Sequence, residues 1–223
     1  MLGNINLFRD LDDESLELVE RLILWRKYNK NDVVLNHRED SNRVYLISSG
    51  SVKATRFSYS GKEISYQTLG AGDIFGEIAA IDGGFRTTSI ICAENSEIGA
   101  ISAENFSDLI DTYPTIARGV MLRLTGLIRF LCGRVYEYSA LDVRDRVRAE
   151  ILRYARMNIG SGVGAVVSNM PTHEEIANKV STHREAVTKE FSYLSREGVI
   201  QKNGREVVVP DIKKLALMIS EEV

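Results

Sequence analysis

The residue types most suited to chemistry lie in residues 72–89, whose sequence is GDIFGEIAAIDGGFRTTS. The stretch holds the carboxylate of Glu77, the guanidinium of Arg86 nine positions later, several glycines and three hydroxyl residues at its end. Backbone amides that glycine leaves accessible, together with a guanidinium, suit a phosphate, and a carboxylate nearby suits the hydroxyls of a sugar. The lysine and the Gly-Lys-Ser/Thr ending of a P-loop are missing. The stretch therefore predicts a nucleotide site of another kind.

Residues 171–189 are a second informative region and predict a helix-turn-helix. Thr172 with Glu175, and Thr182 with Glu185, each form the Thr-x-x-Glu pattern of a capping box. We therefore expect one helix to start at Thr172 and a second at Thr182, with only residues 178–181 left for a tight turn. The apolar side chains of the second helix that are expected to face the core are Ala186, Val187, Phe191 and Leu194.

The outer face of the second helix predicts contact with DNA bases. Its polar residues are His183, Arg184, Glu185 and Lys189. Arginine can bond guanine through two hydrogen bonds, and glutamate can accept from N4 of cytosine. A solvated charged face is the alternative, but two consecutive capping boxes favour a DNA-reading helix. We also assign DNA contact to the residues at the helix starts, Thr172, His173 and Thr182.

Residues 199–209 predict a β-hairpin after this second helix. Asn203-Gly204 lies between two strand-like runs, and this dipeptide is the strongest short hairpin signal. The hairpin makes the module a winged helix-turn-helix. Lys202 and Arg205 near its tip are expected to contact phosphates, which would position the protein on DNA without reading the sequence.

The elements before residue 113 must position the nucleotide site. Residues 7–26 predict a short helix with Asp12 or Asp13 as its N-cap. Several short strand-like runs bounded by turn residues follow, which is typical of an antiparallel barrel, roll or sandwich. The predicted strands cover residues 33–35, 44–47, 52–57, 64–69, 87–92 and 98–101. A helix is expected again over residues 102–111.

A long helix is predicted to begin at Pro114. Its apolar residues recur at spacings of four and three, as in a coiled-coil seam. They are Ala117, Met121, Leu124, Ile128, Leu131, Val135 and Tyr138. We expect this seam to form a dimer, and the alternative is a helix that faces its own core. Residues 139–142 are a predicted hinge, followed by a helix to about residue 157 and a loop over 160–164.

Composition limits the class of protein. The 223 residues carry a formal charge of −3, but residues 142–214 carry 13 Lys and Arg against 10 Asp and Glu, a modest sign of a nucleic-acid face. The beginning of the chain has no leader-like segment, and no apolar run reaches the length of a membrane span, so we expect a cytoplasmic protein. The two cysteines do not suffice for an iron–sulfur cluster. The three histidines have no nucleophile or metal-spaced partner nearby, so neither catalytic residues nor metal ligands are assigned.

Taken together, the order of these parts resembles the CRP/FNR family of bacterial transcription regulators over nearly the whole chain. Three segments carry the resemblance. Residues 75–88 resemble a phosphate-binding cassette, residues 141–146 resemble the hinge after the dimer helix, and residues 182–189 resemble a recognition helix. The resemblance implies an α+β fold in three parts. These are an antiparallel β-roll of the cyclic-nucleotide-binding type over residues 1–113, a dimerisation helix over 114–141 and a winged helix-turn-helix over 142–223.

The resemblance also implies roles for residues of the cassette. Glu77 would accept a hydrogen bond from the ribose 2′-hydroxyl, beside Gly76 and the backbone of Ile78 and Ala79. Arg86 would pair with the cyclic phosphate, and Thr87 would contact the phosphate or the base, as in cyclic-GMP-binding domains. Where cAMP-responsive members place a Thr-Ser pair against adenine, this chain has Leu131 and Cys132, so cAMP and cGMP both remain open as effectors.

For the recognition helix, the resemblance implies that Arg184 and Glu185 read a GTGA-type half-site. Lys189 stands where the family has a third arginine contact, and lysine cannot form a two-pronged bond to guanine. The expected partners are palindromic double-stranded DNA, a second copy of the chain and RNA polymerase. The alternatives are a member that needs no nucleotide, one that senses another effector such as a gas through haem (His37 could be a ligand), and a nucleotide-gated module that acts on a protein.

Overall fold

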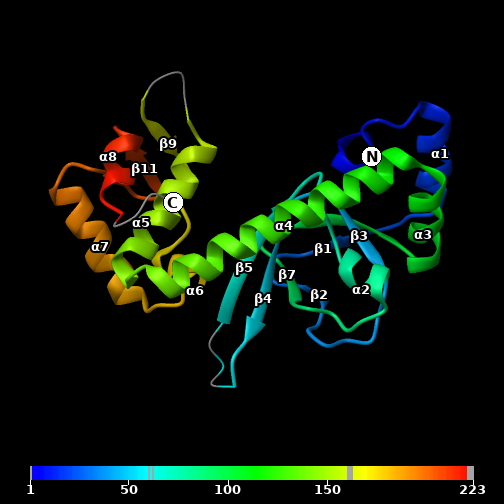
Figure 1. The fold of residues 1–223 in the computed structure, drawn as a ribbon, viewed down its shortest axis with the longest axis horizontal. Coiled ribbons are helices and arrows are strands. Elements are labelled where there is room, and N and C mark those ends of the chain that lie inside the picture. Colours follow the sequence, from blue (N-terminus) through cyan, green and yellow to red (C-terminus); the bar gives the residue numbers. More distant parts are fainter. Residues whose placement is uncertain (1, 60, 62, 160–162, 220–223) are drawn as a thin grey trace. The chain divides into compact units, whose positions relative to one another are not determined.

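The computed structural model describes residues 2–59, 61, 63–159 and 163–219, and the chain forms two compact units, Met1–Leu127 and Ile128–Val223 (Figure 1). The boundary between the units lies within a continuous helix, α4 (Pro114–Ala140). The three-part division at residues 113 and 141 stays a prediction. Among the described residues, no helix is long and apolar enough to cross a membrane.

The N-terminal unit contains two four-stranded antiparallel sheets, which confirms the predicted roll. One sheet has the order β1-β8-β3-β6 and the other β2-β7-β4-β5, so neighbours along the chain are often in different sheets. The strands are β1 (Leu24–Tyr28), β2 (Val33–Leu35), β3 (Val44–Ser49), β4 (Ser51–Phe57), β5 (Glu63–Gly70), β6 (Ile74–Phe75), β7 (Ser89–Cys92) and β8 (Ser96–Ile101). Alternation of buried and exposed residues places one face of each sheet on a common core.

Helices cover the other face of the sheet that contains β3 and β8. They are η1 (Leu2–Asn4), η2 (Asn6–Phe8), α1 (Asp13–Arg21), α3 (Ala103–Thr112) and the first part of α4; the short α2 (Glu77–Asp82) follows β6. Buried apolar residues such as Phe8, Phe106 and Ile116 form this second core with Val44 and Ile101 of the sheet. The first part of α4 is therefore anchored to the N-terminal unit.

The predicted helix over residues 7–26 was too long. The side chain of Asp12 caps α1 by accepting from the backbone N–H of Ser15 at 2.7 Å, as expected, but the helix ends at Arg21. From Leu24 the chain is a strand, β1, paired with β8. The prediction failed because Leu22 and Ile23 continue a helical apolar spacing, whereas β1 becomes a strand by pairing with a segment that is distant along the chain. The strands β1 and β6 were both missed.

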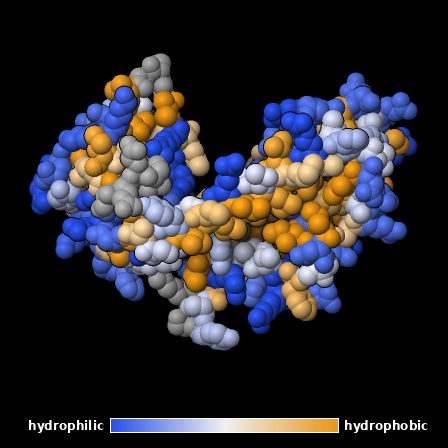
Figure 2. Space-filling model, viewed as in Figure 1, coloured by the Kyte–Doolittle hydropathy of each residue, from blue (hydrophilic) through white to orange (hydrophobic). Residues whose placement is uncertain are grey.

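Helix α4 confirms the predicted long helix from Pro114, and its apolar row is largely exposed (Figure 2). Met121, Ile128 and Val135 expose 60%, 61% and 65% of their surfaces. Such exposed apolar side chains in a regular row are typical of a surface that is covered in an assembly. The alternative that this row faces a core of its own chain is wrong for these three residues.

The C-terminal unit is a small helical domain with a three-stranded sheet. It contains the end of α4, α5 (Val143–Met157), β9 (Ala165–Val167), α6 (His173–Lys179), α7 (Arg184–Arg196), β10 (Gln201–Asn203), β11 (Glu206–Val209) and α8 (Ile212–Leu217). One core of apolar residues, among them Ile151, Ile176 and Leu194, holds the helices together. The helix-turn-helix is α6 and α7, and the hairpin β10-β11 is the predicted wing, with β9 as an unpredicted third strand. Of the predicted loop over 160–164, residues 160–162 lie outside the described residues.

Two local predictions in this unit need correction. The capping box at Thr172 is present, but the one at Thr182 is not: α7 starts at Arg184, and its N-cap is His183. Thr182 is buried at the end of the turn, where its backbone N–H donates to the carbonyl of Ala177 at 2.9 Å. The hairpin turn is formed by Gly204 and Arg205, one residue further along than predicted, because Asn203 already pairs with Glu206.

Candidate nucleotide pocket and nucleic-acid interface

Gly76 shapes the backbone between β6 and α2. It is the N-cap of α2 in the left-handed region, with φ +84°, which favours glycine. A Cβ at this position would lie 2.6 Å from Nη1 of Arg86 and 2.8 Å from the carbonyl oxygen of Arg43. Glycine is therefore required here by conformation and by space. The first backbone N–H groups of α2, including those of Glu77 and Ile78, have no partner within the helix.

Arg86 is buried, with 3% of its surface exposed. Its guanidinium donates through Nε to Oγ of Ser41 at 2.9 Å, through Nη1 to the carbonyl of Gly76 at 2.8 Å, and through Nη2 to the carbonyl of Arg43 at 2.7 Å. All three acceptors are neutral. Burial lowers the pKa of Arg86, opposed by the fields of Tyr45, Glu39 and Glu77. The side chain is fixed in orientation without having its charge neutralised.

Glu77, the first residue of α2, is also 3% exposed and points toward α4. Its Oε1 accepts from Nε of Arg123 on α4 at 3.0 Å. The predicted sugar-binding carboxylate thus has an ion-pair partner 46 positions away along the chain. The ion pair links the pocket directly to the long helix.

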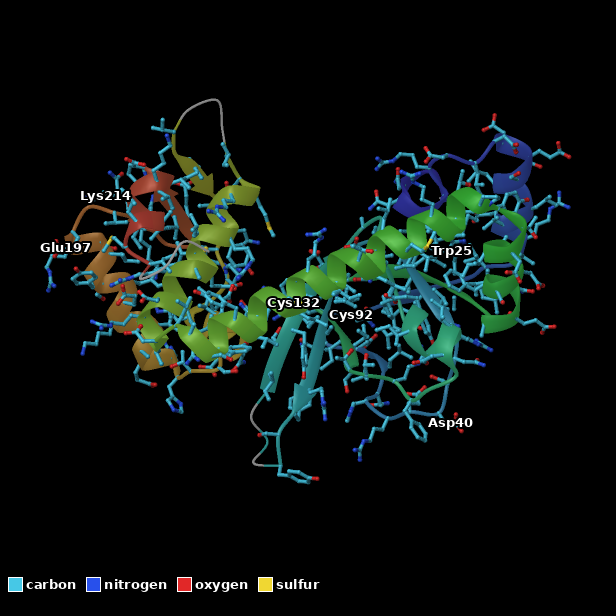
Figure 3. The ribbon with its side chains drawn as sticks, viewed as in Figure 1. Trp25, Asp40, Cys92, Cys132, Glu197 and Lys214 are labelled. Atoms are coloured by element: carbon cyan, nitrogen blue, oxygen red, sulfur yellow. The ribbon has the colours of Figure 1, made fainter. Side chains whose placement is uncertain are left out.

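The other predicted pocket residues have different surroundings. Ala79 is buried, Ile78 is half-buried, and Thr87 is exposed directly after Arg86. Leu131 and Cys132 belong to the other unit, where both are exposed, and the free thiol of Cys132 is labelled in Figure 3. Their assignment to the pocket stays a prediction.

Sequence reasoning missed four residues around Arg86 and Glu77. Ser41 and Arg43 precede β3, Tyr45 lies on β3, and Arg123 lies on α4. The ring of Tyr45 stacks on Phe75 of β6 with centroids 5.0 Å apart, and the guanidinium of Arg86 lies 5.8 Å from the Tyr45 centroid. No local motif marks these residues, because the pairing of β3 with β6 brings Tyr45 to the site and the packing of α4 brings Arg123 to Glu77.

The outer face of α7 exposes the predicted base-reading residues. Arg184, Glu185 and Lys189 are exposed, as is the N-cap His183, while Val187, Phe191 and Leu194 are buried; Ala186 is half-buried. Thr182 is buried, and its assignment to DNA contact stays a prediction. Thr172 is exposed, and its hydroxyl accepts from the backbone N–H of Glu175 at 3.2 Å.

Residues of the wing bond to the helix-turn-helix. Nζ of Lys202 lies 3.0 Å from Nε2 of His173, and the ring of His173 lies against Phe191 with centroids 4.6 Å apart. Nε of Arg205 donates to the carbonyl of Met170 at 3.4 Å. These residues surround a pocket of about 660 Å³ between α6, α7 and the hairpin.

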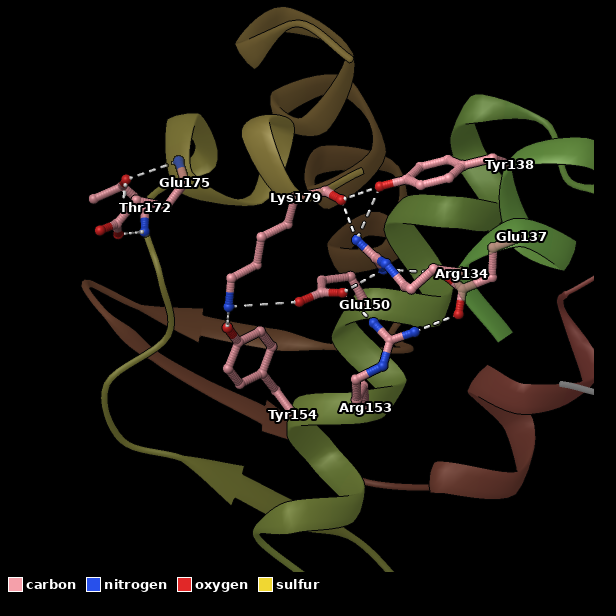
Figure 4. Close-up of polar contacts among 9 residues, drawn as sticks. All are labelled: Arg134, Glu137, Tyr138, Glu150, Arg153, Tyr154, Thr172, Glu175 and Lys179. Carbon is pink, nitrogen blue, oxygen red and sulfur yellow. Dashed lines mark hydrogen bonds and ion pairs between the residues drawn. The ribbon is translucent and has the colours of Figure 1, made fainter. Parts of the chain in front are cut away.

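A buried ion cluster joins the end of α4 to α5 and α6 (Figure 4). Nη1 of Arg134 contacts Glu137 at 2.9 Å and Glu150 at 3.2 Å, and Arg153 and Lys179 also pair with Glu150. Arg134 and the hydroxyl of Tyr138 both donate to the carbonyl of Lys179, near the end of α6. Burial lowers the pKa of Arg134, but Glu150, Tyr138 and Glu137 raise it by more, so its charge is stabilised.

Comparisons with known proteins match both the N-terminal region that contains the candidate nucleotide pocket and the C-terminal region that contains the helix-turn-helix. A cyclic nucleotide-binding domain model matches residues 25–113, and a Crp-like helix-turn-helix domain model matches residues 145–218. The chain is 27% identical over 195 residues to a cyclic AMP receptor protein of Thermus thermophilus, covering 87% of this chain and 88% of the relative. It is 25% identical over 217 residues to a CRP-like cAMP-activated global transcriptional regulator of Mycobacterium tuberculosis, covering 97% of each.

Other matches are a protein kinase and solved structures that share the fold. A cGMP-dependent protein kinase of Drosophila melanogaster is 28% identical over 118 residues, which is 52% of this chain and 13% of the kinase. Among solved structures, a mutant of CooA from Carboxydothermus hydrogenoformans has a TM-score of 0.82 at 21% identity, covering 97% of this chain and 95% of that one. A CRP/FNR-family transcriptional regulator from Thermus thermophilus has a TM-score of 0.66 at 20% identity, covering 90% of this chain and 100% of that one. At these identities the structures show the shared fold.

Proposed function

Because this chain belongs to the CRP/FNR family of transcription regulators, we propose that its effector is a cyclic mononucleotide, cAMP or cGMP, and that its dimer binds palindromic DNA. The two domains of the family, one for the nucleotide and one for DNA, account for most of the chain. RNA polymerase is a further expected partner.

The single observation that carries the effector proposal is the buried guanidinium of Arg86. Its three contacts are to neutral acceptors, and the described residues place no carboxylate within ion-pair distance of it. A buried charge without a counter-charge is costly, so the site favours an anion. Two of the five N–H groups of arginine remain after these contacts, enough for the oxygens of one phosphate.

The base of the nucleotide is a narrower question. The relatives in Thermus and Mycobacterium are named for cAMP, whereas the kinase of Drosophila is named for cGMP. Thr87 is exposed beside Arg86, where its hydroxyl could meet a guanine. Solved structures such as the CooA mutant share the fold alone and do not favour another effector, so a haem or gas sensor is the weaker alternative. A module that acts on a protein instead of DNA would not need the exposed Arg184 and Glu185.

The coupling mechanism follows from Glu77. A ribose hydroxyl that donates to this carboxylate would compete with or join Arg123, so nucleotide binding would change a contact of α4. Exposed apolar residues such as Ile128 and Val135 make α4 the expected dimer seam. The nucleotide would then favour, by population shift, the dimer arrangement in which the two recognition helices lie about 34 Å apart in successive major grooves.

Calorimetric titration of the full chain with cAMP and with cGMP, in separate experiments, tests the effector. We expect one of them to bind, and Arg86→Ala to remove the binding while Arg118→Ala, a change on α4 away from the pocket contacts, does not. Binding of neither nucleotide to the wild-type chain would refute the effector proposal. The melting curve of each variant shows whether it is folded.

Gel-shift titration on a palindromic GTGA-type duplex tests the DNA side. We expect the nucleotide to raise the affinity, and equal affinity with and without it would refute ligand control. Arg184→Ala should cost about 1–3 kcal/mol of discrimination at one base pair. Arg196→Ala is the matched control, because Arg196 is exposed at the other end of α7. Equal weakening on all sequences would make Arg184 a phosphate contact instead.

A further inference from the structure

His173 connects the three elements that form the DNA-binding surface. It is the first residue of α6, its Nδ1 lies 2.8 Å from Oγ1 of Thr188 on α7, and its Nε2 lies 3.0 Å from Nζ of Lys202 on the wing. The aromatic ring rests on Phe191, and Nζ of Lys202 lies 5.6 Å from the centroid of the same Phe191 ring. The wing lysine is thus held against the recognition helix through one imidazole.

The hydrogen bonds determine the proton on this imidazole. An ammonium can only donate, so Nε2 of His173 must accept from Lys202 and carries no proton. Nδ1 then holds the proton and donates to Thr188, whose hydroxyl passes its own hydrogen to the carbonyl of Arg184 at 3.0 Å. Each of the three hydrogen bonds in this series, from Lys202 to His173, from His173 to Thr188 and from Thr188 to Arg184, joins a donor to an acceptor only while the ring is neutral.

The surroundings of the ring oppose a second proton. The charged residues that line its pocket are Glu174 of α6, Arg184 of α7, Lys202 of β10 and Arg205 of the turn, three cations against one anion. Burial, Lys202 and Arg184 each lower the pKa of His173 from its ordinary value of 6.5. Acid below this lowered pKa would nevertheless put a positive ring, with a proton on Nε2, directly against the ammonium of Lys202.

We propose that His173 is a positioning residue for the DNA-binding surface that retains the wing Lys202 only in its neutral form, so that acidification releases this lysine toward DNA phosphate. Repulsion between two cations 3.0 Å apart breaks the link between wing and recognition helix. The freed ammonium contacts the phosphate backbone, which binds all sequences alike. Mild acid therefore raises the affinity for DNA of any sequence by the same factor. The proposal rests on the proposed DNA-binding function.

The test measures binding of the full chain to a palindromic GTGA-type duplex and to a scrambled duplex, at pH 8 and pH 5.5, over a salt series. For the wild-type chain, log affinity for the scrambled duplex should fall with log salt concentration. Acid should make this negative slope steeper by about 0.9, the value for one added phosphate contact. The ratio of specific to scrambled affinity should stay the same, because the added phosphate contact strengthens binding to both duplexes by the same factor. Failure to bind either duplex at pH 8 would instead refute the DNA-binding function itself.

His173→Gln is the decisive variant. Its amide can accept from Lys202 and donate to Thr188 at every pH, so the DNA affinity of this variant should be the same at both pH values. His37→Gln, which changes a histidine of the N-terminal unit, is the control and should keep the acid response. The same acid response in His173→Gln as in the wild type would overturn the proposal.

An independent measurement does not depend on the DNA sequence. Nitrogen NMR shifts of the imidazole at pH 8 should show the proton of His173 on Nδ1, and the Lys202→Met variant should raise the pKa of the ring. A proton on Nε2, or an unchanged pKa in Lys202→Met, would equally overturn the proposal.

Discussion

Replacing Arg123 should show how much the ion pair between α4 and Glu77 contributes to the free energy of unfolding of the N-terminal unit. In Arg123→Met the carboxylate of Glu77, on a residue that is 3% exposed, loses its ion-pair partner. Loss of one partner of a buried pair costs about 3–5 kcal/mol, because the remaining charge is left uncompensated. The side chain of Arg123 is 22% exposed, so water can replace part of its charge and we expect the lower end, about 3 kcal/mol.

A double-mutant cycle separates this effect from lost packing. Glu77→Gln replaces the carboxylate with a neutral amide of similar size, which needs no counter-charge. In this background Arg123→Met should cost less than about 1 kcal/mol, so the two changes should be coupled by about 2 kcal/mol. Arg118→Met, on the same helix but without an ion pair to Glu77, should cost little in either background.

Trp25 provides the assay. It is the one tryptophan of the chain, it lies on β1 of the N-terminal unit (Figure 3), and its indole N–H donates to Glu20 at 2.7 Å. Urea denaturation followed by its fluorescence therefore reports the unfolding of that unit. An equal cost of Arg123→Met with Glu77 and with Gln at position 77 would refute the argument from buried charge.

Three other predictions concern backbone, cap and cluster. Gly76→Ala should reduce cyclic-nucleotide affinity in calorimetry by more than about tenfold, whereas Gly83→Ala, also at positive φ but with open space around its Cβ, should retain it; similar losses in both would contradict the steric argument. Asp142→Ala should lower the free energy of unfolding of the C-terminal unit by about 1 kcal/mol through loss of the N-cap of α5. The hydrogen bond from the backbone N–H of Asp145 lowers the pKa of Asp142 from its ordinary value of 3.8. The contribution of this cap to the free energy of unfolding is therefore complete above pH 3.8 and is lost as the pH falls through the lowered pKa of the folded protein. The same difference in melting temperature between wild type and Asp142→Ala at pH 3 and at pH 7 would contradict this prediction. Arg134→Met should cost about 3–5 kcal/mol in hydrogen exchange of α5, against little for the exposed Arg144→Met, and equal effects would show that the cluster does not stabilise the unit.

The sequence predicted those parts of the fold that depend on local pattern. The alternating strands of the roll, the long helix from Pro114 and the capping box at Thr172 were all found. Strand β1 was missed because its residues Leu24–Tyr28 do not alternate clearly and become a strand through pairing with β8. The second capping box failed because Thr182 is buried, and burial cannot be seen in a four-residue pattern.

For the site, residue type and spacing found the two charged groups that lie within one loop. Glu77 and Arg86 are both buried, and Arg86 donates to the carbonyl of Gly76, the residue before Glu77. The groups that hold them could not be predicted, because two acceptors of Arg86 are backbone carbonyls, which every residue has. From the sequence, Arg123 cannot be distinguished from any exposed arginine of a helix, because its contact with Glu77 depends on the fold.

The ion cluster around Glu150 has a consequence for recombination between regulators. Arg134 and Glu137 lie on α4 and pair with each other, and both also have buried contacts with residues of α5 or α6. A chimera joined at residue 141, between the two helices, would leave Glu150 without Arg134 and would require the donor helix to supply a matching arginine. A fusion that transfers the C-terminal unit to another regulator should therefore be joined within α4, before Arg134. The last turns of α4 then remain with the helices that they contact.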